Sequence, residues 1–271
     1  YPGHAIELAR KAAAQGYPVV AAAGGDGTVN EVINGLMQAQ KENHRSTSLG
    51  VIPIGRGNDF AFGMHIPSDM ESACRTLTQG HHKKIDIGLV SGGDFPNGRY
   101  FGNGIGVGFD AVVGFEAAKM KRLRGFLSYL VAAVKTIFLY YRAPLVRLTL
   151  PGQELELKAL MISVMNGRRM GGSFHMAPDA LNDDKLLDIC IAPEVSRMRI
   201  FGLIGHFMKG TQAGEPEIEI LRSNRLAIRA MSGTLPAHAD GETLCTAGNE
   251  LEIELLPNQL DLLFLEEETA A

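Results

Sequence analysis

The chain has 271 residues, of which 45% are hydrophobic and 21% are charged, and its formal net charge is −4. This length allows one large domain or two of ordinary size, and the composition excludes a mainly disordered chain. Because the net charge is negative, the chain as a whole does not attract nucleic acid, and we expect no nucleic-acid partner.

The first ninety residues alternate between helical and strand-like patterns. Apolar side chains recur at helical spacing in some segments, whereas other segments are short apolar runs typical of buried strands. This alternation predicts a parallel sheet flanked by helices, in which ligands bind at the carboxyl ends of the strands. The expected helices cover residues 5–15, 28–40 and 69–77, and the expected strands cover 19–23, 49–54 and 84–90.

A glycine-rich turn joins the first of these strands to a helix, with the sequence Gly24-Gly25-Asp26-Gly27-Thr28. Unpaired backbone N–H groups at the start of a helix favour phosphate, and glycines let the backbone approach a bulky anion. Asp26 would repel phosphate unless a cation stood between them, so the pairing predicts Mg²⁺-assisted phosphate chemistry. A tight turn with an aspartate helix cap is the alternative that these five residues leave open.

A second glycine-rich loop, Gly55-Arg56-Gly57-Asn58-Asp59, follows the next strand. Its place in the alternation lets the two loops face one phosphate chain. Arg56 would then reach phosphate oxygens, and Asp59 would hold a metal or a substrate hydroxyl. The alternative is a glycine–asparagine turn with a solvated pair of charges.

The pattern changes after residue 94, where most segments become short and β-like. These segments predict an antiparallel sandwich or barrel, and hence a second domain. We place the domains at residues 1–90 and 91–258, with a tail at 259–271 whose run 260–265 would pair in either domain. The expected strands cover 145–150, 157–165, 186–191, 217–221, 226–230 and 251–255, and helical patterns cover 111–141 and 195–209.

Two further acidic positions stand out. Asp86 interrupts an apolar strand, so it lies either on the solvent face or in a site. Asp240-Gly241-Glu242 follows a β-like stretch and, taken alone, is typical of a hairpin turn. A histidine such as His238 is more often structural than catalytic.

Together these motifs resemble the diacylglycerol kinase catalytic family, which also holds sphingosine and ceramide kinases and bacterial lipid kinases. The resemblance covers essentially the whole chain, with the motifs in the family's order and approximate spacing. It implies an N-terminal α/β nucleotide-binding domain, similar to those of phosphofructokinase and NAD kinase, and a C-terminal antiparallel β-sandwich that binds lipid. The matching residues are 24–28 with 30–32, Gly55-x-Gly57-Asn58-Asp59, Asp86-x-Gly88 and Asp240-Gly241-Glu242.

The resemblance also implies an activity and residue roles. The expected reaction transfers the γ-phosphate of ATP to a lipid hydroxyl, most simply that of diacylglycerol to give phosphatidic acid. Asp26, Asp86 and Asp59 match an aspartate–water–Mg²⁺ network beside the ATP phosphates. Asp240 matches the general base, and Glu242 lies by the nucleotide and its metal. The other expected nucleotide-binding residues are Gly24, Gly25, Gly27, Thr28, Gly55, Gly57 and Asn58.

Bacterial members of the family hold a structural Mg²⁺ in a loop of the second domain. The matching ligands here are the Asp184 side chain and the backbone carbonyls of Leu181 and Leu186. Lys185 replaces the usual glycine and puts a positive charge beside the ion. Arg56 likewise replaces a threonine or serine.

Contact with a membrane would be peripheral. A basic cluster at 119–124 precedes the apolar segment 126–141, which is too short to span a bilayer, and the cluster would dock on anionic headgroups. A solvated charge run before a buried helix is the alternative, and the apolar helix at 198–208 would either line an acyl pocket or pack on the sandwich.

Three widely spaced cysteines and no visible signal peptide favour a cytoplasmic location, and homodimerisation is left open.

Two rival functions follow from the same residues. NAD kinases share the 24–28 motif, but the 55–59 loop and the 240–242 motif argue against that activity. The family's opening strand with its Asn-Pro-x-x-Gly loop has no counterpart here, so we expect that an N-terminal piece is missing. Without that loop, the chain would also fit a catalytically silent nucleotide- or lipid-binding protein.

Overall fold

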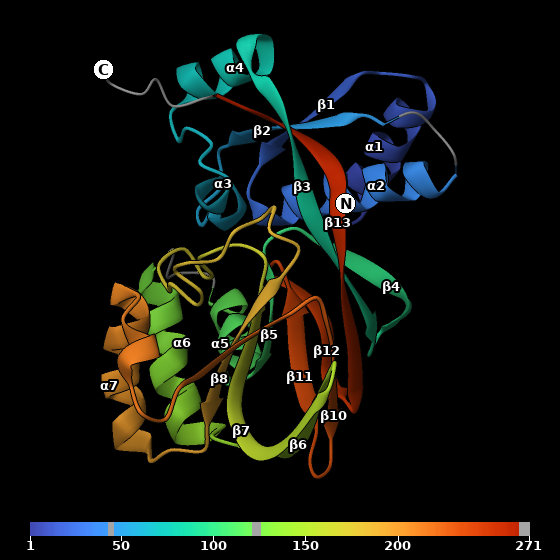
Figure 1. Cartoon of the computed structure of the whole chain (residues 1–271). Helices are drawn as coiled ribbons and strands as arrows, with labels where there is room; N and C mark the ends of the chain where they lie inside the picture. Colours follow the sequence, from blue (N-terminus) through green and yellow to red (C-terminus); the bar gives the residue numbers. More distant parts are fainter. Residues whose placement is uncertain (43–45, 121–125, 266–271) are drawn as a thin grey trace.

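The computed structural model describes residues 1–42, 46–120 and 126–265 and shows two lobes that share one curled sheet (Figure 1). The N-terminal elements form the upper lobe of the figure, and most of the remaining chain forms the lower lobe. The last strand runs through both. Within the described ranges, no helix is both long and apolar enough to cross a membrane.

The upper lobe places the two glycine-rich loops side by side, as the alternation predicts. Its first two strands pair in parallel and end together, with Gly24 opposite Pro53. The loops then touch, because a Cβ on Gly55 would lie only 2.3 Å from the Cα of Gly25. The elements of this lobe are α1 (His4–Ala14), β1 (Val19–Gly24), α2 (Asp26–Lys41), β2 (Ser48–Pro53), α3 (Asp59–Gly63) and α4 (Met70–Gln79).

Two long strands, β3 (His81–Gly92) and β13 (Glu250–Phe264), connect the lobes. They pair antiparallel along almost their whole length. On its other edge, β13 pairs in parallel with β2 in the upper lobe and antiparallel with β10 (Arg225–Ala230) in the lower lobe. The strand expected third in a parallel sheet, β3, is therefore separated from β2 by β13 and runs antiparallel to it.

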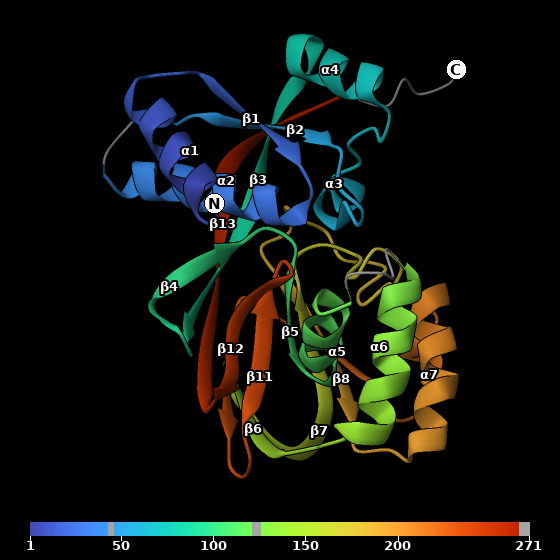
Figure 2. The same ribbon diagram turned by 180° about the vertical axis from the view of Figure 1, so that it is seen from behind.

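The lower lobe is an antiparallel sheet that curls around an apolar core, with three helices packed together beside it in both views (Figures 1 and 2). Strands pair in the order β13-β10-β6-β7-β5-β11-β12. Its remaining elements are β4 (Phe95–Phe101), β5 (Gly104–Gly108), α5 (Phe109–Ala118), α6 (Phe126–Leu139), β6 (Leu145–Leu150), β7 (Gln153–Met165), β8 (Leu187–Pro193), α7 (Arg197–Lys209), β9 (Glu219–Ser223), β11 (Leu235–Ala239) and β12 (Glu242–Gly248), with a 3₁₀ turn at Gln212–Gly214.

Three details of this lobe differ from the sequence expectations. The helical pattern at 111–141 forms two helices, α5 and α6, and the two runs 251–255 and 260–265 form the single strand β13. β5 has the sequence Gly-Ile-Gly-Val-Gly and was not expected, because glycine disfavours strands by composition alone. The strand is nevertheless formed, because β7 and β11 pair with it on both edges.

Candidate active site

The first glycine loop places Asp26 at the start of α2, and the next residue, Gly27, lies beside Glu242 of the lower lobe. Asp26 accepts a hydrogen bond on Oδ1 from the Phe60 backbone N–H at 3.0 Å. Its Oδ2 faces Gly57, where a Cβ would come within 2.8 Å of that oxygen. A Cβ on Gly27 would lie 3.0 Å from Glu242 Oε1. The missing side chains of both glycines therefore leave room beside two carboxylates.

Asn58 shapes the second loop from within. Its backbone is left-handed, with φ of 52°. Its side chain accepts a hydrogen bond from the Gly55 N–H at 3.0 Å and donates to the Pro53 carbonyl at 3.2 Å. Asparagine tolerates this conformation better than most residues, so its observed contacts are those of a loop-forming residue.

Asp59 is buried and bonded to the lower lobe. Its Oδ1 lies 2.8 Å from Nε of Arg169, and the Gly172 N–H donates to Oδ1 and Oδ2 at 3.1 and 2.9 Å. Burial is the main cause that raises the pKa of Asp59, followed by the nearby charge of Asp26. The carboxylate thus lies at the site, but its observed partners are protein donors.

Asp240 occupies the tight turn between β11 and β12. Asp240 and Gly241 both have positive φ, 49° and 84°, as a two-residue hairpin turn requires. Oδ2 accepts from the Asn30 side chain at 2.9 Å and from the Gly102 N–H at 2.8 Å. Oδ1 accepts from the N–H groups of Asn103 at 3.0 Å and Gly104 at 2.8 Å. Burial raises the pKa of Asp240 in spite of these donors.

The structure does not place Asp86 with these residues. Asp86 is fully buried, and it does not line the cavity that the other acids share. Its Oδ2 accepts from the Lys185 N–H and its Oδ1 from the Asn258 N–H, both at 2.7 Å. Asp86 therefore links β13, at the point where its register with β3 shifts, to the loop that carries Asp184.

That loop does not fit the structural Mg²⁺ expected from Leu181, Asp184 and Leu186. Asp184 Oδ1 accepts from the Leu186 N–H at 3.0 Å, and Oδ2 is paired with the Arg222 guanidinium. Lys185, where the family has glycine, holds φ of 69°. Because a guanidinium already neutralises the aspartate, we derive no metal-dependent step from this loop.

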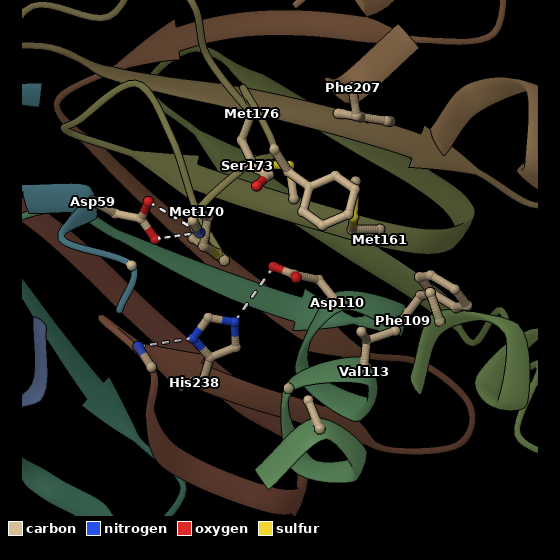
Figure 3. Close-up of a pocket in the computed structure, with 18 of the residues that line it drawn as sticks. Asp59, Phe109, Asp110, Val113, Met161, Met170, Ser173, Met176, Phe207 and His238 are labelled. Carbon is tan, nitrogen blue, oxygen red and sulfur yellow. Dashed lines mark hydrogen bonds and ion pairs between the residues drawn. The ribbon is translucent and has the colours of Figure 1, made fainter. Parts of the chain in front are cut away.

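The remaining acids all line one cavity of about 580 Å³. Figure 3 shows part of this lining, with Asp59 and Asp110 among the labelled residues. One end is polar and includes both glycine loops, and the other end lies among α5, α7, β7 and the loop 166–176. Helix 198–208, for which packing and an acyl pocket were both open, contributes Leu203 and Phe207 to this lining. The polar lining includes Asp26, Gly27, Arg56, Gly57, Asp59, Asp240 and Glu242, and the apolar lining includes Phe109, Val113, Met161, Met170, Met176 and Phe207.

Asp110 and His238 also line the cavity. The sequence motifs did not mark Asp110, and for His238 they favoured a structural role. His238 Nε2 lies 3.4 Å from Asp110 Oδ2, and Nδ1 of the same ring accepts from the Gly241 N–H at 3.3 Å. A neutral ring with these contacts carries its proton on Nε2. The available signal was an aspartate two residues after the glycine-rich segment Gly104–Gly108, in the first turn of α5.

The basic cluster at 119–124 lies largely outside the described residues. Lys119 is described, and it pairs with the buried Glu116 at 2.6 Å. Lys135 of α6 reaches the same carboxylate at 2.5 Å. Both lysines lower the pKa of Glu116, mainly by hydrogen bonding to its carboxylate. Lys119 thus neutralises a carboxylate at the end of α5, and Lys135, which lies outside the cluster, links α6 to the same carboxylate.

The cavity carboxylates fit a divalent cation that a nucleotide would bring. Across the described residues, no group of three histidine, cysteine or acidic side chains is arranged to hold a metal by itself. Mg²⁺, however, is commonly held by one or two carboxylates together with substrate phosphates and waters. Asp26 Oδ2 and the Glu242 carboxylate face the cavity and offer such oxygens.

Comparison with known proteins gives consistent matches. Residues 1–90 match the diacylglycerol kinase catalytic domain, and residues 103–264 match the YegS C-terminal NAD kinase beta sandwich-like domain. A diacylglycerol kinase from Staphylococcus aureus is 30% identical over 241 residues, which cover 89% of this chain and 73% of that protein. A YegS-like lipid kinase from Chromohalobacter salexigens is 34% identical over 73% of this chain and 61% of its own.

A solved structure supports the fold. A crystal structure of a protein assigned as a diacylglycerol kinase from Bacillus anthracis superimposes with a TM-score of 0.78 at 24% identity. The match covers 97% of this chain and 82% of the other. The fold class expected from the sequence, an α/β part followed by a β-sandwich, is confirmed.

Proposed function

The chain belongs to the diacylglycerol kinase catalytic family and is a lipid kinase, and on this premise we propose that it phosphorylates diacylglycerol to phosphatidic acid with ATP and Mg²⁺. The observation that carries the proposal is the cavity with two unlike ends. Its volume is in the range of small-molecule sites, and one phosphate-binding end beside one apolar end suits a lipid that accepts a phosphoryl group.

The phosphate end contains the groups that a nucleotide needs. The N-terminus of α2 presents backbone N–H groups beside the adjoining glycine loops, where phosphate oxygens would be stabilised. Arg56 is the one arginine or lysine among the described residues that line the cavity, and its guanidinium would bind phosphate oxygens. Asp26 and Glu242 would hold Mg²⁺, which when bound neutralises charge on the transferring phosphate.

Asp240 is the proposed general base for the lipid hydroxyl. It lines the cavity, and its burial raises its pKa, which makes the carboxylate a better proton acceptor. Four N–H donors hold it in place, so one of these bonds must lengthen when the carboxylate accepts a proton. The apolar end would hold an acyl chain against its methionine and phenylalanine side chains.

Peripheral contact with the membrane would bring the lipid to this end. Phe138 of α6 and Phe201 of α7 form an exposed pair, with ring centroids 6.2 Å apart. Leu139 and Met198 are exposed on the same two helices. Such side chains insert readily at a bilayer surface, close to the helices that line the apolar end.

The test is a phosphorylation assay with radiolabelled ATP and purified protein. Mixed micelles would carry dioleoylglycerol, monooleoylglycerol, phosphatidylglycerol or sphingosine, and a separate reaction would contain NAD. Mg²⁺-dependent labelling of dioleoylglycerol above the other lipids supports the proposal. Preferred labelling of another lipid reassigns the substrate, labelling of NAD reassigns the activity, and no labelling with intact ATP binding indicates a silent binding protein.

A further inference from the structure

The loop 166–174 of the lower lobe is bonded to the second glycine loop by one arginine. Arg169 Nε lies 2.8 Å from Asp59 Oδ1, and its Nη2 donates to the Gly57 carbonyl at 2.9 Å. The guanidinium also lies over the ring of Phe62, 4.0 Å from the centroid. Gly172, from the same loop, donates its N–H to Asp59. One guanidinium thus fixes the carboxylate, the backbone and an aromatic ring of the opposite lobe.

This contact is enclosed rather than superficial. The Asp59 side chain is 8% exposed and that of Arg169 is 17% exposed. A buried ion pair needs both partners, because removing one leaves an uncompensated charge. Three hydrogen bonds from Arg169 and Gly172 already reach the Asp59 oxygens, so both oxygens of this carboxylate are engaged by donors of the lower lobe.

The same loop continues to the proposed base and to the lipid end of the cavity. The Arg169 carbonyl accepts from the Asn103 side chain at 2.9 Å, and the Asn103 N–H donates to Asp240 at 3.0 Å. Met170, the next residue after Arg169, lines the apolar end. Arg169 therefore lies on a continuous set of contacts from the phosphate loop to the acceptor aspartate.

We propose that Arg169 is a positioning residue that latches the phosphate loop of one lobe to the acceptor site of the other through Asp59. This inference rests on the proposed function and deepens it, because it assigns Asp59 to alignment of the two substrates instead of to metal binding. The latch holds Gly57 at a fixed distance from Asp240, so phosphate donor and lipid hydroxyl meet in line. A displacement of about 1 Å at such a site lowers turnover by roughly 10²-fold.

The decisive experiment compares Asp59→Asn, Arg169→Met, Arg169→Lys and the Asp59→Asn/Arg169→Met double variant with wild type. The variable is the kcat for dioleoylglycerol, measured across a Mg²⁺ titration at saturating ATP. Arg229→Met is the matched control, because it breaks an exposed arginine–glutamate pair outside the cavity. Melting curves establish that each variant is folded at the assay temperature.

The latch predicts that Asp59→Asn and Arg169→Met each lower kcat by about 10²-fold, and that the double variant is no worse than either. Arg169→Lys recovers part of the loss, because the ammonium still pairs with Asp59. The Mg²⁺ concentration for half-maximal rate stays at the wild-type value. If Asp59→Asn alone raises that concentration, or if the two losses multiply, Asp59 acts independently of Arg169 and the proposal is overturned.

Amide hydrogen exchange tests the latch without any substrate. In Arg169→Met, the segments 55–60 and 168–174 should exchange faster together, and Asp59→Asn should give the same pattern. Unchanged protection in either segment overturns the latch. If the wild-type protein labels no lipid, but both variants still speed exchange in the two segments, the kinase assignment is refuted and the contact between the lobes is established.

Discussion

At the scale of single residues, hydrogen-bond partners distinguish acids that the sequence treats alike. The motifs around Asp26 and Asp240 could be recognised from the sequence, because glycine spacing and order along the chain carry them. The partners could not, since the donors to Asp240 come from positions 30 and 102–104. Asp110 and His238 were also hidden, because their pairing depends on the register of β5 with β11.

Asp26→Asn should remove Mg²⁺-dependent transfer and leave the fold intact. The amide oxygen of asparagine can still accept from the Phe60 N–H, whereas the charge that faces the cavity is lost. Loss of a carboxylate from a metal-assisted site costs roughly 3 kcal/mol of transition-state stabilisation or more, about 10²-fold in kcat. The measurement is kcat against Mg²⁺ concentration, with Asp69→Asn, a helix-cap acid outside the cavity, as control. Normal turnover with a normal melting curve would refute the role.

Asp240→Asn should lower both turnover and stability. A lost general base typically lowers kcat by about 10²–10⁴-fold, with little effect on ATP affinity. The new NH₂ group would also face backbone N–H donors, and one unsatisfied buried donor costs about 1–3 kcal/mol in the free energy of unfolding. Steady-state kinetics and urea unfolding measure the two effects. Weakened ATP binding with normal kcat would assign Asp240 to the nucleotide instead.

At the scale of elements, distant strands override local expectations. The apolar run 84–90 could be predicted as a strand, but its partner could not, since β13 lies some 160 residues later. The family resemblance likewise implied a cation at 181–186. It gave no indication that Arg222, on β9, would pair with Asp184 and lie 3.2 Å from Asp188.

The melting temperature of the wild-type protein should therefore not change with Mg²⁺ concentration when nucleotide is absent. A ligand raises stability only if it binds the folded state, and Arg222 already neutralises the loop. Arg222→Met removes that charge and should lower the melting temperature. Thermal scans with and without MgCl₂ or EDTA check the expectation, with Asp183→Ala, which breaks the neighbouring exposed pair with Lys83, as control. A rise with Mg²⁺ in wild type that disappears in Asp184→Ala would instead establish a bound ion.

At the scale of the whole molecule, two long strands and several acidic side chains join the two lobes, so we expect the lobes to unfold together. β3 and β13 contribute to both lobes, and apolar residues of both strands lie in the core of each. The sequence predicted two domains from a change of pattern near residue 90, whereas β3 and β13 each contribute to both lobes. The sequence left open that the run 260–265 pairs in either domain, but it did not reveal that this run continues the strand from 250, or that β3 also enters both lobes.

Asp86 provides the sharpest test of this arrangement. Its fully buried carboxylate accepts the Lys185 and Asn258 N–H groups, and thereby ties β3 to the β13 register shift and to the loop before β8. Asp86→Ala would leave both donors unsatisfied, at a cost of about 1–3 kcal/mol each in the free energy of unfolding. Urea unfolding followed by far-UV circular dichroism and by tyrosine fluorescence should show a large loss of stability in one shared transition.

The control for this prediction is Asp261→Asn, a partly exposed aspartate on β13 that pairs with the exposed Lys84 and should change stability little. The expected kinetic result is that Asp86→Asn loses activity only as far as it loses folded protein, since the residue does not line the cavity. Full loss of kcat with an unchanged unfolding curve would instead assign Asp86 to the catalytic metal network. Because the pair β3–β13 spans both lobes, we expect one unfolding transition. Two separate transitions would instead show that the lobes fold independently.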